Sequence, residues 1–195
     1  MITDINQLDL SKTYSYADYL TWMFQDRLEL YRGKIFKMSL EPSMYHQKVS
    51  RDLTIILGNK FKNHSCNLFV APFDVRLLDS KKSKKDSDVY TVVQPDLCVV
   101  CDEAKLDARG AIGAPDLIVE ILSPGNSKKE MTYKYDLYQE AGVLEYWMIN
   151  PADKTMLIYV LKNGIFEGQK PLIEESIVKS RLFPELDFTL SEIFN

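Results

Sequence analysis

The sequence predicts an α/β fold, with a mixed sheet and helices on its faces. Several short apolar runs have the length of strands, and a strand, a helix and a strand follow one another between residues 115 and 149. Because a helix between two neighbouring strands lets them run parallel, this succession favours a partly parallel sheet. The 195 residues are 46% hydrophobic, enough for a sizeable core, and no linker, repeat or low-complexity segment interrupts them. We therefore predict a single domain over residues 1–195.

The first half of the chain is expected to form two helices and a hairpin. A helix is predicted from Tyr16 to Gln25, capped by Ser15, with three residues toward the core: Leu20, Met23 and Phe24. A hairpin is predicted over residues 28–38, with its turn at Arg32-Gly33. After Pro42-Ser43, a long helix is indicated by apolar residues that recur every three or four positions: Val49, Leu53, Ile56, Leu57 and Phe61.

The second half of the chain is expected to contain most of the sheet. Strands are predicted near residues 68–78, 89–100 and 115–122. Ser127 and Glu130 have capping-box spacing, so a helix is predicted over residues 128–141, ending at Gly142. Two further strands are predicted, over residues 143–149 and 156–161.

Charge and cysteine content limit the function classes. The net charge of −4 argues against a protein that coats nucleic acid nonspecifically. The lysine-rich segment 80–87 is either a solvated loop or a phosphate contact. Three cysteines leave an odd thiol and no disulfide framework, which favours a reducing, cytoplasmic setting. No secretory signal is expected, and no apolar stretch approaches the roughly 20 residues of a membrane span.

Two Pro-Asp dipeptides, each opening an apolar run, carry the lead functional hypothesis. Asp96 begins one predicted strand, and Glu120 lies in the middle of the next. A carboxylate inside a buried strand needs a partner, a proton or a metal. Neighbouring strands lie about 4.8 Å apart, so pairing of these two could bring both carboxylates onto one divalent cation. The alternative for Glu120 is a structural ion pair with a buried Lys or Arg. Asp116 is about 13 Å along the strand from Glu120 and is expected to hold the strand entrance.

Three other side chains are candidates for the same site. Lys134 lies in the first turns of the helix that follows Glu120, where its ammonium could stabilise charge on a phosphorane or could simply be solvated. His46, at the start of the long helix, and Glu29, in the hairpin, are possible supporting residues. Cys98 and Cys101 have zinc-like spacing but point to opposite faces of a strand, and the sequence has no glycine-rich phosphate loop.

A longer set of motifs resembles the restriction endonucleases of the Uma family, over about residues 15–195. The matching segments are Glu29-Leu30-Tyr31-Arg32-Gly33, residues 38–46, Gln94-Pro95-Asp96, the run Ala114 to Pro124, Lys134 with Tyr138, and Gly142 to Trp147 followed by Pro151. That family is similar to the PD-(D/E)xK nuclease superfamily. The resemblance implies a restriction-endonuclease-like mixed central sheet flanked by helices. It also implies that Asp96 and Glu120 are metal ligands for Mg²⁺ (or Mn²⁺).

The chain departs from the superfamily pattern at the lysine. Leu122 stands two residues after Glu120, where that pattern has Lys, and family members supply the amine from the next helix, which Lys134 matches. Glu130 stands where an aspartate is expected. The expected function is metal-dependent hydrolysis of DNA by an endonuclease, which cuts two strands most simply as a homodimer. The alternatives are an inactive nuclease-fold protein that binds nucleic acid or protein, and a structural domain with a buried Glu120–Lys134 ion pair.

Overall fold

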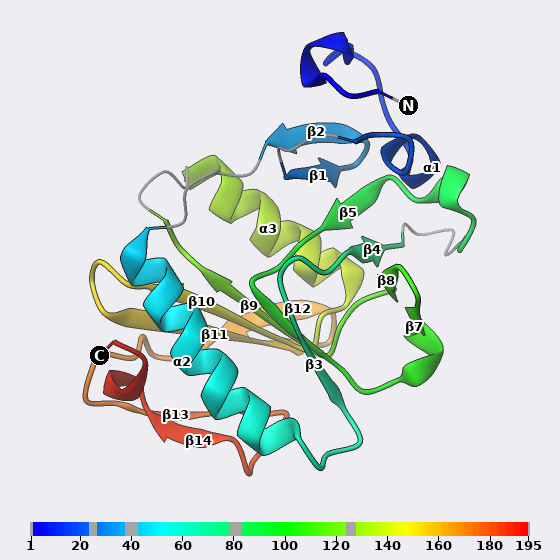
Figure 1. Ribbon diagram of the computed structural model, residues 1–195. Coiled ribbons are helices and arrows are strands. Elements are labelled where there is room, and N and C mark those ends of the chain that lie inside the picture. The colour runs from blue at the N-terminus through cyan, green and yellow to red at the C-terminus, as the bar shows by residue number, and fades with distance from the viewer. Residues whose placement is uncertain (1, 24–26, 38–42, 79–82, 124–127, 195) are drawn as a thin grey trace. The chain divides into compact units, whose positions relative to one another are not determined.

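The computed structural model describes residues 2–23, 27–37, 43–78, 83–123 and 128–194 (Figure 1). Internal contacts group the chain into two compact units. Unit 1 comprises Met1–Glu41, Phe73–Gln94 and Ala104–Ala114, and unit 2 comprises Pro42–Pro72, Pro95–Glu103 and Pro115–Asn195. The chain passes between the units repeatedly rather than through one linker, so a single domain over residues 1–195 stays a prediction.

Unit 2 is built on a six-stranded mixed sheet in the order β12-β11-β10-β9-β6-β3. Its strands are β3 (Asn67–Val70), β6 (Leu97–Val100), β9 (Leu117–Ile121), β10 (Glu145–Asn150), β11 (Thr155–Lys162) and β12 (Ile165–Gly168). Strands β9 and β10 run parallel, and the other neighbours pair antiparallel. Helix α3 (Lys128–Ala141) makes the crossover between β9 and β10. The predicted strand, helix, strand succession is therefore present.

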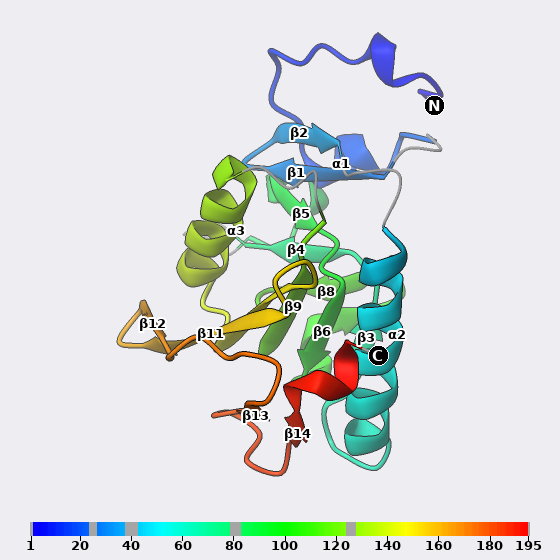
Figure 2. The ribbon, with the colours of Figure 1, turned by 90° about the vertical axis from the view of Figure 1, so that its left-hand side faces the viewer.

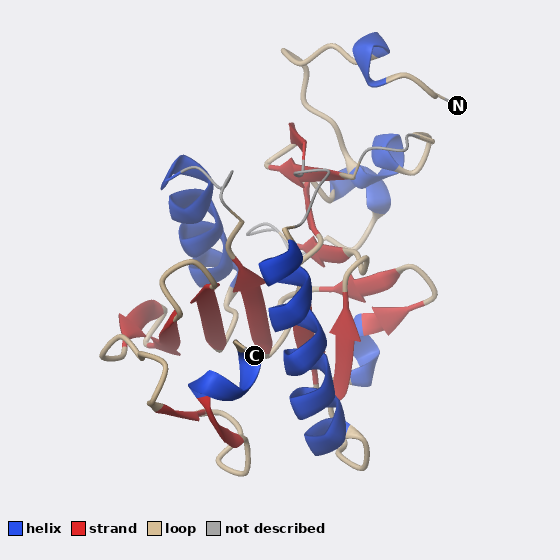
Figure 3. Ribbon diagram, turned by 60° about the vertical axis from the view of Figure 1, so that its left-hand side comes forward, coloured by secondary structure: helices blue, strands red, loops and turns tan. Residues whose placement is uncertain are grey.

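Helices cover the two faces of this sheet. Side chains from alternate strand positions, such as Val119 and Trp147, pack with Leu53 of α2 (Met44–Phe61) in the largest apolar cluster. The same cluster includes residues of β13 (Ile177–Lys179), β14 (Asp187–Thr189) and the 3-10 helix η4 (Leu190–Ile193). On the other face, Tyr138 of α3 contacts Tyr146 edge to face. Figures 2 and 3 show α2 and α3 separated by the strands.

Unit 1 contains a second six-stranded sheet, in the order β2-β1-β5-β4-β8-β7. The strands of this sheet are β1 (Leu28–Tyr31), β2 (Lys34–Lys37), β4 (Val75–Leu77), β5 (Thr91–Val93), β7 (Leu106–Asp107) and β8 (Gly110–Ile112). Unit 1 also contains helix α1 (Tyr16–Tyr19) and the short 3-10 turns η1 (Ile5–Gln7) and η2 (Asp86–Asp88). A third 3-10 turn, η3, spans Glu103–Lys105. The hairpin turns at Arg32-Gly33 as predicted, and both residues have positive φ, which is the geometry of a tight hairpin turn.

Several predicted boundaries are wrong, chiefly at prolines. The predicted strand 68–78 is two strands in different sheets, β3 and β4, and Ala71-Pro72 lies between them. The predicted strand 89–100 likewise divides at Gln94-Pro95 into β5 and β6. Proline has no N–H to donate and restricts the residue before it, so it interrupts a ladder. Strands β7, β8, β12, β13 and β14 were not predicted.

The first helix is shorter than expected. Helix α1 ends at Tyr19, and Leu20 and Met23 are exposed, so their predicted place in the core is wrong. Phe24 and the predicted end at Gln25 lie outside the described residues. By contrast, α3 spans the predicted residues 128–141, and Gly142 follows it with a φ of +88°. The proposed cap at Ser127 lies outside the described part of the chain.

One disulfide corrects the prediction from the cysteine count. Asn67 pairs with Val100, so the next positions along this ladder, Cys66 and Cys101, lie opposite one another and are joined. Cys98 is the odd thiol, and it is buried. The pairing depends on strand register over 35 residues of sequence separation, which the spacing could not reveal. A cytoplasmic location therefore has no support from the cysteines. Among the described residues, no helix is long and apolar enough to cross a membrane.

Candidate active site

Two carboxylates lie at neighbouring positions of adjacent strands in the unit 2 sheet. Strands β6 and β9 pair antiparallel with Leu97 opposite Val119, so one further step along the ladder places Asp96 opposite Glu120. Directly opposed side chains of antiparallel strands lie about 5 Å apart at Cβ and share a face. The backbone N–H of Ile121 donates to Asp96 Oδ2 over 2.7 Å, which holds Asp96 against β9. The strand register therefore allows one small cation to reach both carboxylates.

Helix α3 brings two donors to Glu120. Lys134 Nζ lies 2.8 Å from Glu120 Oε1, and Tyr138 Oη donates to the same oxygen over 2.6 Å. Residues four apart on a helix share a face, which explains how both reach one atom. The side chains of Lys134 and Glu120 are only 8% and 9% exposed. Lys134 is thus not a solvated helix lysine, and the ion pair named as the structural alternative is present.

Tyr138 was named in the sequence only as part of the family resemblance, without a role in the site. It is fully buried, and its hydroxyl ends at the candidate metal ligand. The signal was its position one helical turn after Lys134, on the face that meets the sheet.

His46 approaches Asp96 from helix α2. Ser43 caps this helix by accepting from the His46 backbone N–H, which sets His46 in the first turn. The His46 ring is buried, and its Nε2 lies 3.2 Å from Asp96 Oδ1. Its Nδ1 is shielded from solvent and has no hydrogen-bond partner among the described residues. Nε2 can therefore donate its proton to Asp96 and orient that carboxylate.

Groups around Glu120 show the electrostatic effect of its carboxylate. Burial raises the pKa of the Tyr146 hydroxyl well above its usual value, and the charge of Glu120 adds to the rise while Lys134 opposes it. The pKa of the Cys98 thiol is raised by burial and then by Glu120. Both groups therefore stay protonated at neutral pH and contribute no charge of their own to this face of the sheet.

Glu29 belongs to unit 1, whereas the other four candidates belong to unit 2. It is buried in β1, where its Oε2 accepts from the Tyr31 hydroxyl and its Oε1 accepts from the Gln94 backbone N–H. Gln94 precedes Asp96 by two residues in the chain. Within unit 1, Glu29 therefore ties β1 to the segment that follows β5, and its supporting role in the site stays a prediction.

Two other features singled out in the sequence are Asp116 and the lysine-rich segment 80–87. Asp116 Oδ2 accepts from the Cys101 backbone N–H over 2.8 Å, so Asp116 holds the entrance of its strand, as expected. In the lysine-rich segment, residues 80–82 lie outside the described residues, and the Ser83 hydroxyl donates to Asp88. A phosphate contact by this segment stays a prediction.

The two carboxylates suit an ion that keeps several waters, such as Mg²⁺, better than a metal that is held by protein ligands alone. In the described part of the chain, no group of three or more His, Cys, Asp or Glu side chains could hold a metal. Mg²⁺ keeps several waters and is commonly bound by one or two carboxylates together with substrate phosphates. Asp96 and Glu120 would supply that number of hard oxygen ligands, and softer zinc ligands are not grouped among the described residues.

Comparisons with known proteins bear on the fold and the family of this chain. A solved structure described as a "putative nuclease belonging to DUF820", from Anabaena variabilis, superposes with a TM-score of 0.71 over 93% of this chain and 97% of its own. Its sequence identity is 19%, so it supports the fold alone. A curated relative, "Uncharacterized protein slr1290" of Synechocystis sp., is 25% identical over 134 residues, which are 68% of this chain. The match spans 65% of that relative's length.

A family model extends over most of the chain. The model of the Uma2 family, described as "Putative restriction endonuclease", matches residues 16–191. This range contains all five residues that the sequence analysis singled out. The restriction-endonuclease-like fold expected from the sequence is confirmed, and the chain belongs to the Uma2 family.

Proposed function

We propose that this protein is a Mg²⁺-dependent endonuclease that hydrolyses DNA phosphodiester bonds. The observation that supports the proposal most is the placement of Asp96 opposite Glu120 with the Lys134 ammonium on the same Glu120 oxygen. Two carboxylates and an amine are the set that a phosphodiesterase needs to hold a cation and to stabilise charge on phosphorus. Membership of a restriction endonuclease family supports the same reading.

Each residue has a separate role in the proposed mechanism. Asp96 and Glu120 would hold the ion, which supplies a water of lowered pKa and polarises the phosphate. Lys134 places a positive charge 2.8 Å from Glu120 Oε1, where it can stabilise negative charge that develops on a bound phosphate. Tyr138 orients Glu120 and His46 orients Asp96 through the hydrogen-bonding contacts described above. Neither of these two residues needs to touch the substrate.

Matched substitutions test the assignment. Asp96→Asn and Glu120→Gln keep side-chain shape and remove one charge each, so both should abolish Mg²⁺-dependent cleavage of plasmid DNA. Asp116→Asn is the control, since Asp116 also follows a proline but binds the Cys101 N–H. We expect this control to cleave at the wild-type rate. Cleavage that persists in both site variants, with circular dichroism showing normal folding, would reject the proposed roles.

A second reading is also supported by an observation. Glu120 Oε1 accepts hydrogen bonds from both Lys134 and Tyr138, which satisfy this oxygen within the protein. An inactive nuclease-fold protein that binds nucleic acid or protein could keep this network as a structural element. Calorimetric titration with Mn²⁺ separates the readings, because an active site should show binding that Asp96→Asn removes. An inactive protein should show no carboxylate-dependent heat.

Assembly and location complete the proposal. Cleavage of both strands of a duplex is simplest with two sites related by a two-fold axis, so we propose a homodimer. Sedimentation equilibrium should give twice the mass of one chain, and a monomer at every concentration would contradict it.

We propose a cytoplasmic location as well. Cell fractionation tests it, and a periplasmic or secreted protein would instead agree with the Cys66–Cys101 disulfide.

A further inference from the structure

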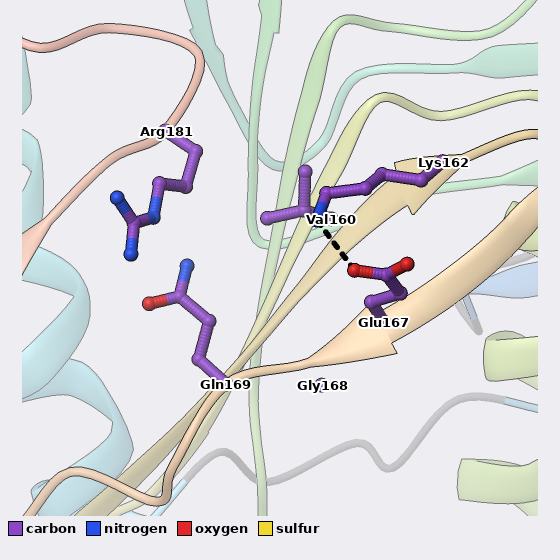
Figure 4. A pocket seen from close by; sticks show the side chains of 6 residues that line it. All are labelled: Val160, Lys162, Glu167, Gly168, Gln169 and Arg181. Carbon is purple, nitrogen blue, oxygen red and sulfur yellow. Dashed lines mark hydrogen bonds and ion pairs between the residues drawn. The ribbon is translucent and has the colours of Figure 1, made fainter.

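A pocket of about 420 Å³ lies in unit 2, apart from the two carboxylates. Strands β11 and β12 form its floor, and the turn after β13 forms a wall (Figure 4). The residues that line it are Val160, Lys162, Glu167, Gly168, Gln169 and Arg181. Pockets of this size accept small ligands or single groups of larger ones.

Strand register places this pocket on the other face of the sheet from Glu120. Val160 pairs with Glu145, and Glu145 pairs with Leu117, so these three share a face. Glu120 is three positions after Leu117, and successive residues alternate between faces. The pocket floor therefore faces the side that α2 covers, whereas Glu120 faces α3. A ligand in this pocket would not compete for the Asp96 and Glu120 carboxylates.

Two donor groups line this pocket, the Arg181 guanidinium and the amide nitrogen of Gln169. Figure 4 shows the amide group of Gln169, nitrogen and oxygen alike, turned toward the Arg181 guanidinium. Gln169 Nε2 is shielded from solvent. Among the described residues it has no hydrogen-bond partner, and no carboxylate pairs with the exposed Arg181 side chain. A buried donor without an acceptor is costly. An oxyanion between the two groups would satisfy both.

Charge sets the class of anion. Lys162 donates to Glu167 Oε2 over 2.5 Å at one side of the pocket, so these two charges cancel. Arg181 then leaves a net charge of +1 among the lining residues, and the buried Glu145 carboxylate behind its backbone offsets part of that charge, so a monoanion complements the pocket better than a dianion. A phosphodiester is a monoanion whose two unesterified oxygens match the fork of a guanidinium.

The frame around the donors is fixed. The Gln169 backbone N–H donates to Ile158 O, and the Arg181 backbone N–H donates to Glu145 Oε2. Both residues are therefore anchored through their backbones, and the exposed side chain of Arg181 is open to a ligand. Substitution of either side chain should leave the surrounding backbone in place.

We propose that this pocket binds a phosphodiester monoanion of nucleotide size, held by Arg181 and Gln169. The ligand is either one nucleotide of a nucleic-acid strand or a free cyclic nucleotide. The inference does not depend on cleavage activity, because the pocket and the carboxylates lie on different faces. Loss of one function would leave the other measurable.

Amide chemical-shift changes in the ¹⁵N-labelled protein test the proposal. Dimethyl phosphate, the smallest phosphodiester, should cause saturable shifts at residues 169 and 181, at constant ionic strength. Arg181→Gln should weaken binding by about tenfold or more, the effect of losing one charged hydrogen bond. Lys154→Gln is the control, since it removes the same charge from an exposed pair with Glu174. It should leave the affinity unchanged.

A second variant tests the geometry without loss of a side chain. Gln169→Glu places a carboxylate beside Arg181, so it should occupy the guanidinium and prevent binding of dimethyl phosphate. Acetate that binds as tightly as dimethyl phosphate would overturn the assignment to a phosphodiester. No saturable shift in the wild type, or equal affinity in Arg181→Gln, would overturn the site itself.

Two probes then distinguish the sources. The dinucleotide d(TpT) represents a strand, and 3′,5′-cyclic AMP represents a free nucleotide. Tighter binding of either one than of dimethyl phosphate supports the proposal and identifies the source. If neither binds more tightly, the nucleotide assignment is wrong.

Discussion

The buried ion pair between Lys134 and Glu120 allows a quantitative prediction of stability. Two unit charges 2.8 Å apart attract one another by about 6 kcal/mol at an effective dielectric constant of about 20. Both groups have also lost most of their hydration, so that attraction is not net stabilisation. Removal of one partner from such a pair costs about 3–5 kcal/mol, since it leaves the other charge buried. Lys134→Met should fall near the lower value, because Tyr138 still donates to Glu120.

Urea unfolding at neutral pH measures this cost. Lys154→Met is the matched control, because Lys154 Nζ lies 2.6 Å from Glu174 but the two side chains are 48% and 37% exposed. An exposed pair contributes at most about 1 kcal/mol. The double variant Glu120→Leu with Lys134→Met should recover much of the lost stability, since no buried charge is left. A loss under about 0.5 kcal/mol for Lys134→Met would refute the reasoning and indicate that the ammonium is hydrated.

Three further predictions concern other buried polar groups. Tyr138→Phe removes the 2.6 Å hydrogen bond to the Glu120 carboxylate and should cost about 1.5–3 kcal/mol in urea unfolding; an unchanged midpoint would contradict that bond. Glu145→Ala should lower the free energy of unfolding by at least about 3 kcal/mol, because the fully buried carboxylate accepts from Trp147 Nε1 and from the backbone N–H groups of residues 181 and 182. Denaturant midpoints measure this loss, and a value below about 1 kcal/mol would contradict the prediction. Burial, helped by the charge of Asp74, raises the pKa of Tyr16 from 10.0 to about 12. The neutral form is therefore favoured in the folded state, so its contribution to stability is complete below pH 10 and is lost as the pH rises toward 12; Tyr16→Phe should make urea midpoints less sensitive to pH in that range, and an identical pH profile would contradict the assignment.

Local features of the sequence determined several elements of the fold. Helix α3 has the predicted bounds, because the two signals used for it, capping-box spacing at its start and Gly142 after its end, act within a few residues. The turn at Arg32-Gly33 is equally local. The fold class followed from the order of elements, since a helix between β9 and β10 requires a crossover. The sequence could also place Lys134 near Glu120, because only a short connection separates strand β9, which contains Glu120, from helix α3, which contains Lys134.

Only the tertiary structure decided features that depend on distant pairing. The register of β6 against β9 sets Asp96 opposite Glu120, and a slip of one residue would turn one of the two carboxylates to the other face. The register of β3 against β6 likewise joins Cys66 to Cys101. Strand register is chosen by the packing of the whole core, so no short stretch of sequence contains it. For that reason the sequence could name the chemical groups of the site, whereas the folded chain determined which of them meet.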